Sequence, residues 1–255
     1  MSARKVKNIL ISQPKPSSEK SPYYDIAEKY NLEVHFYPFI KVDRLSSKEF
    51  RQQRINILDF TAIIFTSRTA VDKFFSLCEE MKILIPEEMK YFCISETVAL
   101  YLQKYIVYRK RKIFFSQTGK IEGLNNPFTK HSKEKFLFPV PEEHNDEVTQ
   151  FLDIKKLNYT KSIMYRTVSA DFPENEKMNY DMIIFFSPLG IQSLVKNFPD
   201  YKQGDAAIGC FGGTTAKAVE EVGFRLDCEA PQPEYPSMVA ALDAFLKENH
   251  KNHNS

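Results

Sequence analysis

Short apolar segments alternate with stretches of helical spacing along most of this chain, and this alternation constrains its fold more than any other feature. The clearest expected strand–helix pairs cover residues 61–66 and 69–81, 91–94 and 96–104, 181–186 and 188–197, and 206–211 and 213–222. Further strands are expected at residues 8–12, 32–37, 135–138 and 161–165, and further helices from Ser17 or Ser18 to residue 30, near 143–155 and over 237–249. This order predicts an α/β protein whose parallel sheets carry helices on both faces.

A sequence repeat divides the chain into two similar parts. The segments 63–67 (IIFTS) and 183–187 (IIFFS) are identical at four of five positions, and each precedes a helix with regular apolar spacing. Two α/β units of about 120 residues fit a 255-residue chain. Shared strand preference accounts for some of the similarity, so duplication and common local preference both remain open.

Two extended connections mark where the chain can cross between these parts. Residues 37–42 contain a proline and precede the first repeat, and residues 165–169 precede the second. If both segments are crossings, residues 40–166 form a domain inserted into another domain made of residues 1–39 and 167–255. Such a two-stranded hinge between similar lobes would create a cleft.

Small polar residues occupy the junctions where expected strands turn into helices. At the carboxyl edge of a parallel sheet such junctions bind ligands, and a helix start favours carboxylate or phosphate. The candidate ligand-binding residues are Ser67, Arg68, Thr69, Ser95, Glu96, Thr97, Ser187, Pro188, Leu189, Gly190, Gly212, Gly213, Thr214 and Thr215. At any single junction, N-capping explains the serine or threonine. Four junctions together, with five of the eight glycines lying between Gly190 and Gly213, favour a ligand with several separated anions.

Composition and missing motifs exclude several other functions. A net charge of +2 argues against a dedicated nucleic-acid binder, and no apolar run is long enough for a membrane span or signal peptide. Four widely spaced cysteines fit reduced thiols in a cytoplasmic protein. The sequence has no dinucleotide or Walker glycine motif and no nucleophile elbow, and its five histidines form no metal-ligand set.

Two further features each have two readings. The basic run 109–112 (RKRK) could attract an anionic substrate or RNA, although a solvated turn explains it as well. Tyr165 ends an expected strand at the second crossing. It is either a buried core tyrosine or a phenol directed into the cleft as a proton donor.

Several short motifs together resemble the uroporphyrinogen-III synthase family, and the resemblance extends over essentially the whole chain. The segments that carry it are 64–71 (IFTSRTAV), 165–167 (YRT), 185–190 (FFSPLG), 211–218 (FGGTTAKA) closed by Gly223, and the prolines at 231, 233 and 236. The stretch 211–218 is the most specific of them.

The resemblance implies two flavodoxin-like α/β domains, one inserted in the other, joined by a two-stranded linker with the active site between them. It implies a lyase of tetrapyrrole and haem biosynthesis that closes hydroxymethylbilane to uroporphyrinogen III, with inversion of ring D and without metal or organic cofactor. Tyr165 would then protonate the departing hydroxyl, and the helix starts would hold the eight carboxylates of the substrate. Because no large exposed apolar stripe is left unassigned, we expect a monomer. We also expect it to act in the cytoplasm and to take its substrate by transient hand-over from hydroxymethylbilane synthase.

A non-catalytic protein is the alternative interpretation. A hinged two-lobe binder or sensor of a tetrapyrrole or another polycarboxylate would use the same cleft and helix starts. Sequence separates the two poorly, because the expected enzyme has no diagnostic nucleophile or metal.

Overall fold

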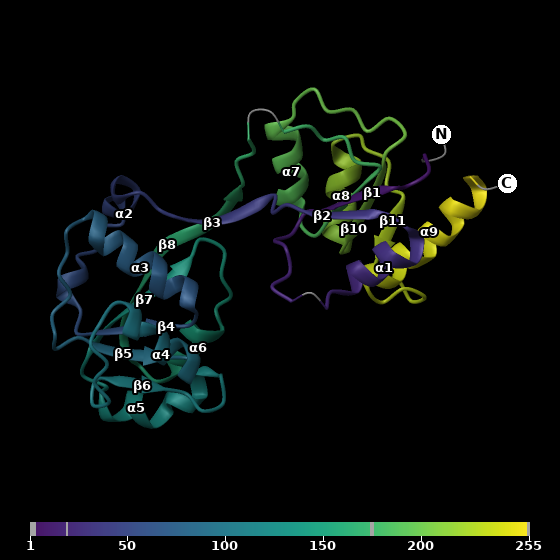
Figure 1. The fold of residues 1–255 in the computed structure, drawn as a ribbon. Coiled ribbons are helices and arrows are strands. Elements are labelled where there is room, and N and C mark those ends of the chain that lie inside the picture. Colours follow the sequence, from purple (N-terminus) through teal and green to yellow (C-terminus); the bar gives the residue numbers. More distant parts are fainter. Residues whose placement is uncertain (1–3, 19, 174–175, 254–255) are drawn as a thin grey trace. The chain divides into compact units, whose positions relative to one another are not determined.

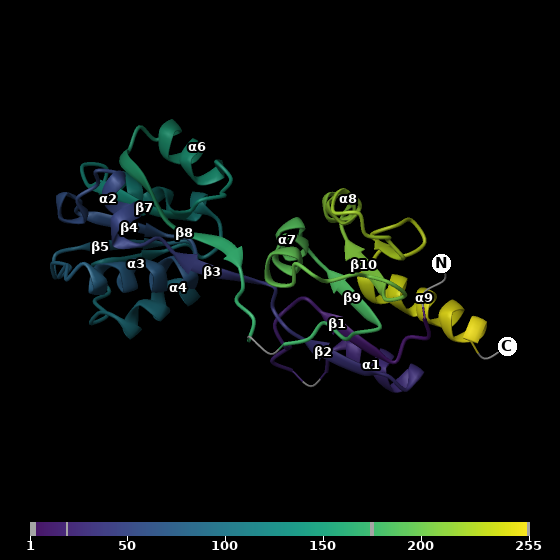
Figure 2. The same cartoon turned by 90° about the horizontal axis from the view of Figure 1, so that it is seen from above.

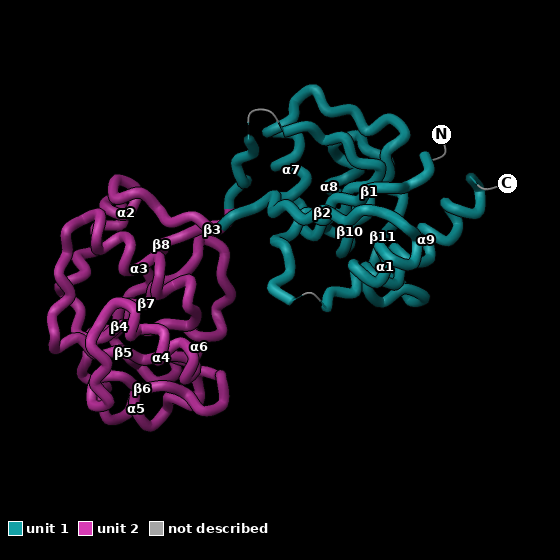
Figure 3. Tube along the Cα trace, in the orientation of Figure 1, with its two compact units in different colours: residues 1–41, 168–255 teal, residues 42–167 magenta. Residues whose placement is uncertain are grey.

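The computed structural model describes residues 4–18, 20–173 and 176–253, and in it the chain forms two α/β units, each built on its own sheet (Figure 1). Unit 1 comprises residues 1–41 and 168–255, and unit 2 comprises residues 42–167 (Figure 3). The expected α/β architecture with helices on both faces of the sheets is confirmed, and the sheets are mainly parallel.

The chain passes between the units twice, once within β3 (Ile40–Arg44) and once within β8 (Asn158–Ser169), and these strands are neighbours. The Leu45 N–H donates to the Met164 carbonyl, and the Ala170 N–H donates to the Phe39 carbonyl. Because one partner number rises as the other falls, β3 and β8 run antiparallel. The two connections therefore form a hydrogen-bonded ribbon.

In unit 1 the described strands form one sheet in the order β11-β10-β9-β1-β2, with parallel pairing throughout. These strands are β1 (Asn8–Ile11), β2 (Glu33–Phe36), β9 (Met182–Phe185), β10 (Ala207–Phe211) and β11 (Cys228–Ala230). The helices of this unit are α1 (Pro22–Tyr30), α7 (Pro188–Asn197), α8 (Gly213–Glu221) and α9 (Met238–His253).

Alternate side chains of β1 enter opposite halves of the core of unit 1, as expected for a strand with period two. Ile9 and Ile11 pack in the cluster that contains α1 and α9, and Leu10 packs in the cluster that contains α7 and α8. Figure 2 shows these two helix pairs on opposite sides of the sheet. All three side chains are at most 1% exposed.

In unit 2 the described strands form a second sheet in the order β3-β8-β7-β4-β5-β6. Its remaining strands are β4 (Ala62–Phe65), β5 (Lys90–Cys93), β6 (Ile113–Phe115) and β7 (Lys135–Pro141). The α-helices are α2 (Ser47–Gln52), α3 (Arg68–Glu80), α4 (Glu96–Tyr101), α5 (Asn125–Lys130) and α6 (Glu147–Ile154), with 3-10 turns at Ile57–Asp59, Leu102–Lys104 and Ile121–Leu124. Ile63 and Phe65 pack with α3 and α4, whereas Ala62 and Ile64 pack with α5 and α6.

Two expected helix starts are wrong. The first helix begins at Pro22 after Ser21, because a proline at the first helical position needs no N–H partner and has the right φ. It is therefore not capped by Ser17 or Ser18. The helix expected near residue 143 begins at Glu147, since the Pro141 carbonyl lies 2.8 Å from His144 Nδ1 in a turn.

The four cysteines are free and buried. Burial raises the pKa of each thiol, to about 12. They are therefore neutral core side chains at neutral pH. Within the described ranges, none of the helices has both the length and the apolar character to cross a membrane.

Replacing Phe92 by alanine tests how strongly unit 2 depends on its aromatic core. Phe92 is fully buried, and its ring centroid lies 4.9 Å from those of Phe114 and Phe128. We expect a loss of about 3–5 kcal/mol in the free energy of unfolding, measured by urea denaturation, because a cavity remains. Leu84→Ala is the control, because Leu84 is 89% exposed and its loss should change stability by less than about 0.5 kcal/mol. Equal effects of the two changes would contradict this account.

Candidate functional site

In unit 2, Ser67 lies where β4 ends and α3 begins, at the carboxyl edge of the sheet. Its Oγ accepts a hydrogen bond of 3.0 Å from the Ala70 N–H and so caps the helix. A serine hydroxyl that accepts one bond still has its own O–H to donate. Arg68 is exposed at the first position of α3, and its guanidinium carbon lies 5.8 Å from the centre of the Tyr101 ring. This helix start thus offers a hydroxyl and a cation.

Tyr165 is placed by an irregularity in the strand pair β7–β8. Val140 pairs with Ile163 and Pro141 pairs with Tyr165, so Met164 is an extra residue in β8. A bulge of this kind re-aims the following side chain. Met164 and Tyr165, although successive, therefore pack in the same core cluster of unit 2.

The phenol of Tyr165 meets Ser67, far away in sequence but near at the sheet edge. Burial raises the pKa of Tyr165, and a hydrogen bond with Ser67 opposes that shift. With only 7% of its surface exposed, Tyr165 remains protonated at neutral pH. It is therefore able to donate a proton at this edge.

A cavity of about 450 Å³ opens beside these two residues, entirely within unit 2. Its apolar wall consists of Ile94, Phe138, Val140 and Val148. The other lining residues are Thr66, Ser67, Pro141, Glu143, His144, Asn145, Glu147 and Tyr165. The cavity therefore combines an apolar wall with hydrogen-bonding groups, as small-molecule sites do.

His144 holds the loop that lines this cavity. Its Nδ1 lies 2.8 Å from the Pro141 carbonyl, and its Nε2 lies 3.2 Å from Lys161 Nζ. An ammonium group has no acceptor, so Nε2 accepts from Lys161 while the Nδ1–H donates to Pro141. Sequence reasoning missed His144 because its role depends on Lys161 from β8.

Polar contacts from α2 and from its C-cap residue Gln53 hold β8 next to Tyr165. The Gln53 side chain donates to the Ile163 carbonyl at 2.7 Å and accepts from the Ile163 N–H at 2.9 Å. Arg166 donates to Glu49 at 2.6 Å. Bonds from Ser46 and from Arg166 lower the pKa of Glu49, to about 2. Ile163, before Tyr165, and Arg166, after it, are thus both held by α2 and its C-cap residue.

The start of α4 is the least suited of the four junctions to bind an anion. Ser95 Oγ accepts from the Val98 N–H and lies 2.9 Å from Thr97 Oγ1. Glu96 follows it as the first residue of a six-residue helix. Its negative charge opposes anions where the helix N–H groups would attract them.

In unit 1, the start of α7 repeats the construction found at Ser67. Ser187 Oγ accepts from the Gly190 N–H at 3.2 Å, and Pro188 occupies the first helical position. Gly190 is buried, and a Cβ there would lie 3.4 Å from the ring of Phe185. Pro188 has no N–H and Gly190 is enclosed, so the Ser187 hydroxyl and Leu189 are the groups best placed to meet a ligand.

The start of α8 differs because no side chain caps it. Gly212, the N-cap residue, has φ +95°, which only glycine adopts easily. Gly213 and Thr214 are exposed, and a Cβ on Gly213 would meet no atom within 4 Å. Thr215 is 2% exposed, and its N–H donates to the Gly212 carbonyl. The open helix start therefore consists of Gly213 and Thr214, with Thr215 behind it.

An aromatic pair borders this open helix start. Phe186 follows β9 and Phe211 ends β10, and their rings stack with centroids 6.4 Å apart. Phe211 is 38% exposed although its neighbour Cys210 is fully buried. Sequence reasoning did not single out this pair, although each phenylalanine flanks a predicted junction. Their stacking depends on the register between β9 and β10.

The structure thus brings together Ser67 and Tyr165 in unit 2, and Ser187, Gly212 and Gly213 lie on adjacent strand ends of unit 1. Among the residues that the structure describes, no group of three His, Cys, Asp or Glu side chains is arranged to hold a metal ion.

Comparison with known proteins gives the following matches. The profile of the family described as uroporphyrinogen-III synthase HemD matches residues 21–240. A uroporphyrinogen-III synthase from Schizosaccharomyces pombe is 24% identical over 262 residues, covering 96% of this chain and 99% of that protein. The solved structure of uroporphyrinogen-III synthetase from Helicobacter pylori is similar with a TM-score of 0.50 at 17% identity, over 95% of this chain and 99% of that one. At that identity the structural likeness bears on the fold alone.

Adjacent alanine substitutions test the backbone at the start of α8. Gly212→Ala should lower the free energy of unfolding by about 1–2 kcal/mol, because φ is positive there. Gly213→Ala should leave stability within about 0.5 kcal/mol, because its Cβ enters open space. Thermal denaturation of the two variants measures the difference. A Gly213→Ala protein at least as destabilised as Gly212→Ala would contradict the geometry described here.

Proposed function

The chain belongs to the uroporphyrinogen-III synthase family, and from this membership we propose how its own residues perform the reaction of that family. The family consists of lyases of haem biosynthesis that close linear hydroxymethylbilane to uroporphyrinogen III with loss of water. We propose that Tyr165 is the proton donor and that the helix starts bind the substrate carboxylates. The observation that carries this proposal is the protonated phenol of Tyr165 beside Ser67 at a cavity.

Loss of the substrate hydroxyl requires a proton. The phenol of Tyr165 donates it as the carbon–oxygen bond breaks, and water departs. The cation that remains is attacked by the substituted carbon of ring D to give a spiro intermediate. Rearrangement and ring closure release a proton, which restores the phenol. The net change is the loss of one water molecule.

Positioning supplies the rest of the catalysis in this proposal. Hydroxymethylbilane closes spontaneously to the uninverted isomer, so the protein must hold rings A to C while ring D folds. The eight carboxylates of the substrate offer many points of attachment. The proposed groups that hold them are the helix starts at Ser67–Arg68–Thr69, Ser187–Leu189 and Gly213–Thr214, with weaker contributions from Ser95–Thr97 and from the buried Thr215.

The pyrrole rings need surfaces different from those that bind carboxylates. The apolar wall at Phe138 and Val140 accommodates a ring face, and Glu143 and Asn145 supply acceptors for a pyrrole N–H. In unit 1 the exposed Phe211, stacked on Phe186, offers a second ring contact.

An isomer assay tests the activity. Porphobilinogen and hydroxymethylbilane synthase generate the substrate in the presence of this protein, and the oxidised uroporphyrins are separated by chromatography. We expect isomer III to predominate. Isomer I at the level found without the protein would refute the activity. Titration with uroporphyrin would then test the alternative of a non-catalytic polycarboxylate binder.

Tyr165→Phe tests the proton donor. We expect kcat for isomer III to fall by about 100-fold without being abolished, because positioning remains when the acid is lost. The matched control on β8 is Tyr159→Phe, whose hydroxyl donates to Asp153 at 2.8 Å and takes no part in the cavity. Its kcat should be unchanged. An unchanged kcat in Tyr165→Phe would exclude the proposed role.

Phe211→Leu tests the aromatic contact. We expect KM to rise about fivefold with little change in kcat. The reason is that a stacked contact between Phe211 and a pyrrole ring would contribute about 1 kcal/mol to substrate binding. Val222→Ala is the control, because Val222 is equally exposed, at 38%, and follows the opposite end of α8. If the two variants have the same KM as the unmodified protein, Phe211 does not contact the substrate.

We further infer that the protein acts as a monomer in the cytoplasm and receives its substrate from hydroxymethylbilane synthase. Four free, buried thiols fit a reducing compartment. A substrate that closes spontaneously favours a short path between the two enzymes. Size-exclusion chromatography of the protein alone tests the monomer, and chromatography of its mixture with the synthase tests contact between the two enzymes. A stable dimer would exclude the monomer.

A further inference from the structure

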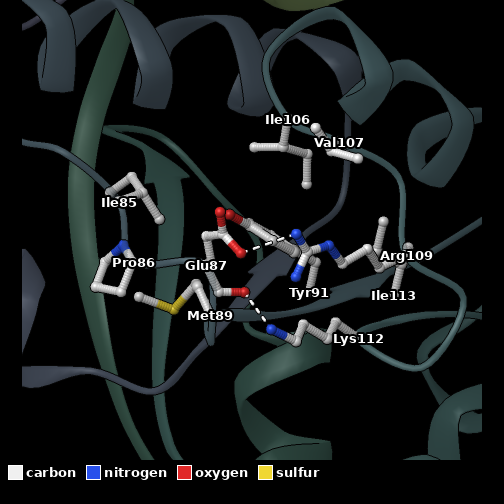
Figure 4. Close-up of a pocket in the computed structure, with 10 residues that line it drawn as sticks. All are labelled: Ile85, Pro86, Glu87, Met89, Tyr91, Ile106, Val107, Arg109, Lys112 and Ile113. Atoms are coloured by element: carbon white, nitrogen blue, oxygen red, sulfur yellow. Dashed lines mark hydrogen bonds and ion pairs between the residues drawn. The ribbon is translucent and has the colours of Figure 1, made fainter.

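We propose that a second cavity in unit 2, at the amino edge of its sheet, binds a small aromatic carboxylate. The cavity has a volume of about 200 Å³ and lies between the segments that precede β5 and β6 (Figure 4). In a parallel sheet this edge is opposite the strand ends that lead to Ser67 and Tyr165. The site is therefore separate from the proposed active site.

The cavity has an apolar interior. Its uncharged lining consists of Ile85, Pro86, Met89, Tyr91, Ile106, Val107 and Ile113. A cavity of about 150 Å³ lined by aliphatic and aromatic side chains is large enough for benzene. Drug-sized ligands require about 300 Å³ or more. The volume therefore fits one aromatic ring with a short substituent.

Two cations line the same cavity. Lys112 is nine-tenths buried, with 9% of its side chain exposed, and its Nζ donates to the Glu87 carbonyl at 2.5 Å. Arg109 is 36% exposed, and its Nη2 lies 2.8 Å from Glu87 Oε2. Figure 4 shows both side chains directed toward Glu87 at the side of the cavity. A planar guanidinium can donate two parallel hydrogen bonds to a carboxylate.

The carboxylates that now accompany these cations are easily displaced. The side chains of Glu87 and Glu88 are 75% and 87% exposed. Ion pairs this open to solvent contribute little to stability. A ligand that places its carboxylate on Arg109 also gains the free energy of burying its ring in the cavity. Glu87 makes the ion pair without that gain. Glu87 thus occupies the position that the ligand carboxylate would take on Arg109.

This arrangement assigns a role to half of the basic run at residues 109–112. Arg109 and Lys112 line the cavity, whereas Lys110 and Arg111 are exposed and are not part of its lining. Four neighbouring cations therefore divide into two that face the cavity and two that face solvent. The division provides internal controls.

Titration of the full-length protein with phenylacetate tests the proposal. Methyl NMR of isoleucine-labelled protein should show saturable shifts at Ile85, Ile106 and Ile113 but not at Ile191 of unit 1. A dissociation constant on the order of 1 mM is expected for a ligand of about ten non-hydrogen atoms. Phenylacetamide, which lacks the charge, and acetate, which lacks the ring, should each bind at least about tenfold more weakly.

Three variants separate specific recognition from general attraction. Arg109→Gln should weaken phenylacetate binding about tenfold, because a charge-assisted contact is lost. Lys110→Gln removes the same charge from the exposed neighbour and should change binding less than twofold. Glu87→Gln should tighten binding by about two- to fivefold, because it removes the competing carboxylate.

Several outcomes would overturn the proposal. These are the absence of saturable shifts at the three isoleucines, equal binding of phenylacetate and phenylacetamide, equal effects of Arg109→Gln and Lys110→Gln, and unchanged or weaker binding in Glu87→Gln. The methyl spectrum of each variant reports whether it is folded. Since isomer III formation is not used as a readout, the result is independent of the proposed function.

Discussion

Each unit depends on a central strand that is paired on both sides and buried on both faces. β9 pairs with β1 and β10, and β4 pairs with β5 and β7, and every residue of β9 and β4 is buried. A parallel strand of this kind cannot slip along its neighbours, because a slip would misplace its apolar side chains and leave peptide groups without hydrogen bonds. The ends of these strands are consequently fixed points. Ser67 and Ser187 follow these strands, each with one residue between the end of the strand and the cap.

The same strand-to-helix construction produces two chemically different helix starts. At Ser67 and Ser187 the cap is internal, so the serine oxygen already satisfies one N–H of the helix. At Gly212 no side chain performs this role, and the backbone turns through a positive φ instead. The unit 1 edge therefore has one helix start that a serine side chain caps and one that a ligand anion can cap. An anion at the open start gains the N–H groups and the helix dipole together.

β8 both connects the two units and places Tyr165. Its later residues carry the chain back into unit 1, and its bulge opposite Val140 and Pro141 places Tyr165 beside Ser67. Gln53 pairs with Ile163 as a further strand would, because its amide provides one donor and one acceptor. The strand is thus held firmly just before Tyr165. Such support matters for a proposed proton donor, because small displacements of a catalytic group are costly.

What the sequence by itself determined is local. The strands β4 and β9, the helices α3 and α7 and the serine caps follow from apolar periodicity and capping signals that lie within a dozen residues. Short elements escaped prediction because pairing creates them. β11 has three residues and exists through its ladder with β10, and α5 is a six-residue helix whose Phe128 packs in the core. α2 is different, because Ser46 and Glu49 form a capping box, a local signal that the sequence prediction missed. The expected caps Ser17 and Ser18 were wrong because Pro22 starts the helix one residue after Ser21.

Only the tertiary structure decided which of these local features meet. Strand order brings Tyr165 from β8 to Ser67 after β4, and register stacks Phe186 on Phe211. The bulge at Met164 could not be foreseen, because a one-residue insertion leaves no trace in composition or period. The division of the basic run into two cavity-lining and two exposed side chains also depends on the loops between which it lies. Helix caps and apolar periodicity depend on residues that are neighbours in the chain. Contacts between distant residues depend on which strands pair, and the pairing of strands depends on the whole core.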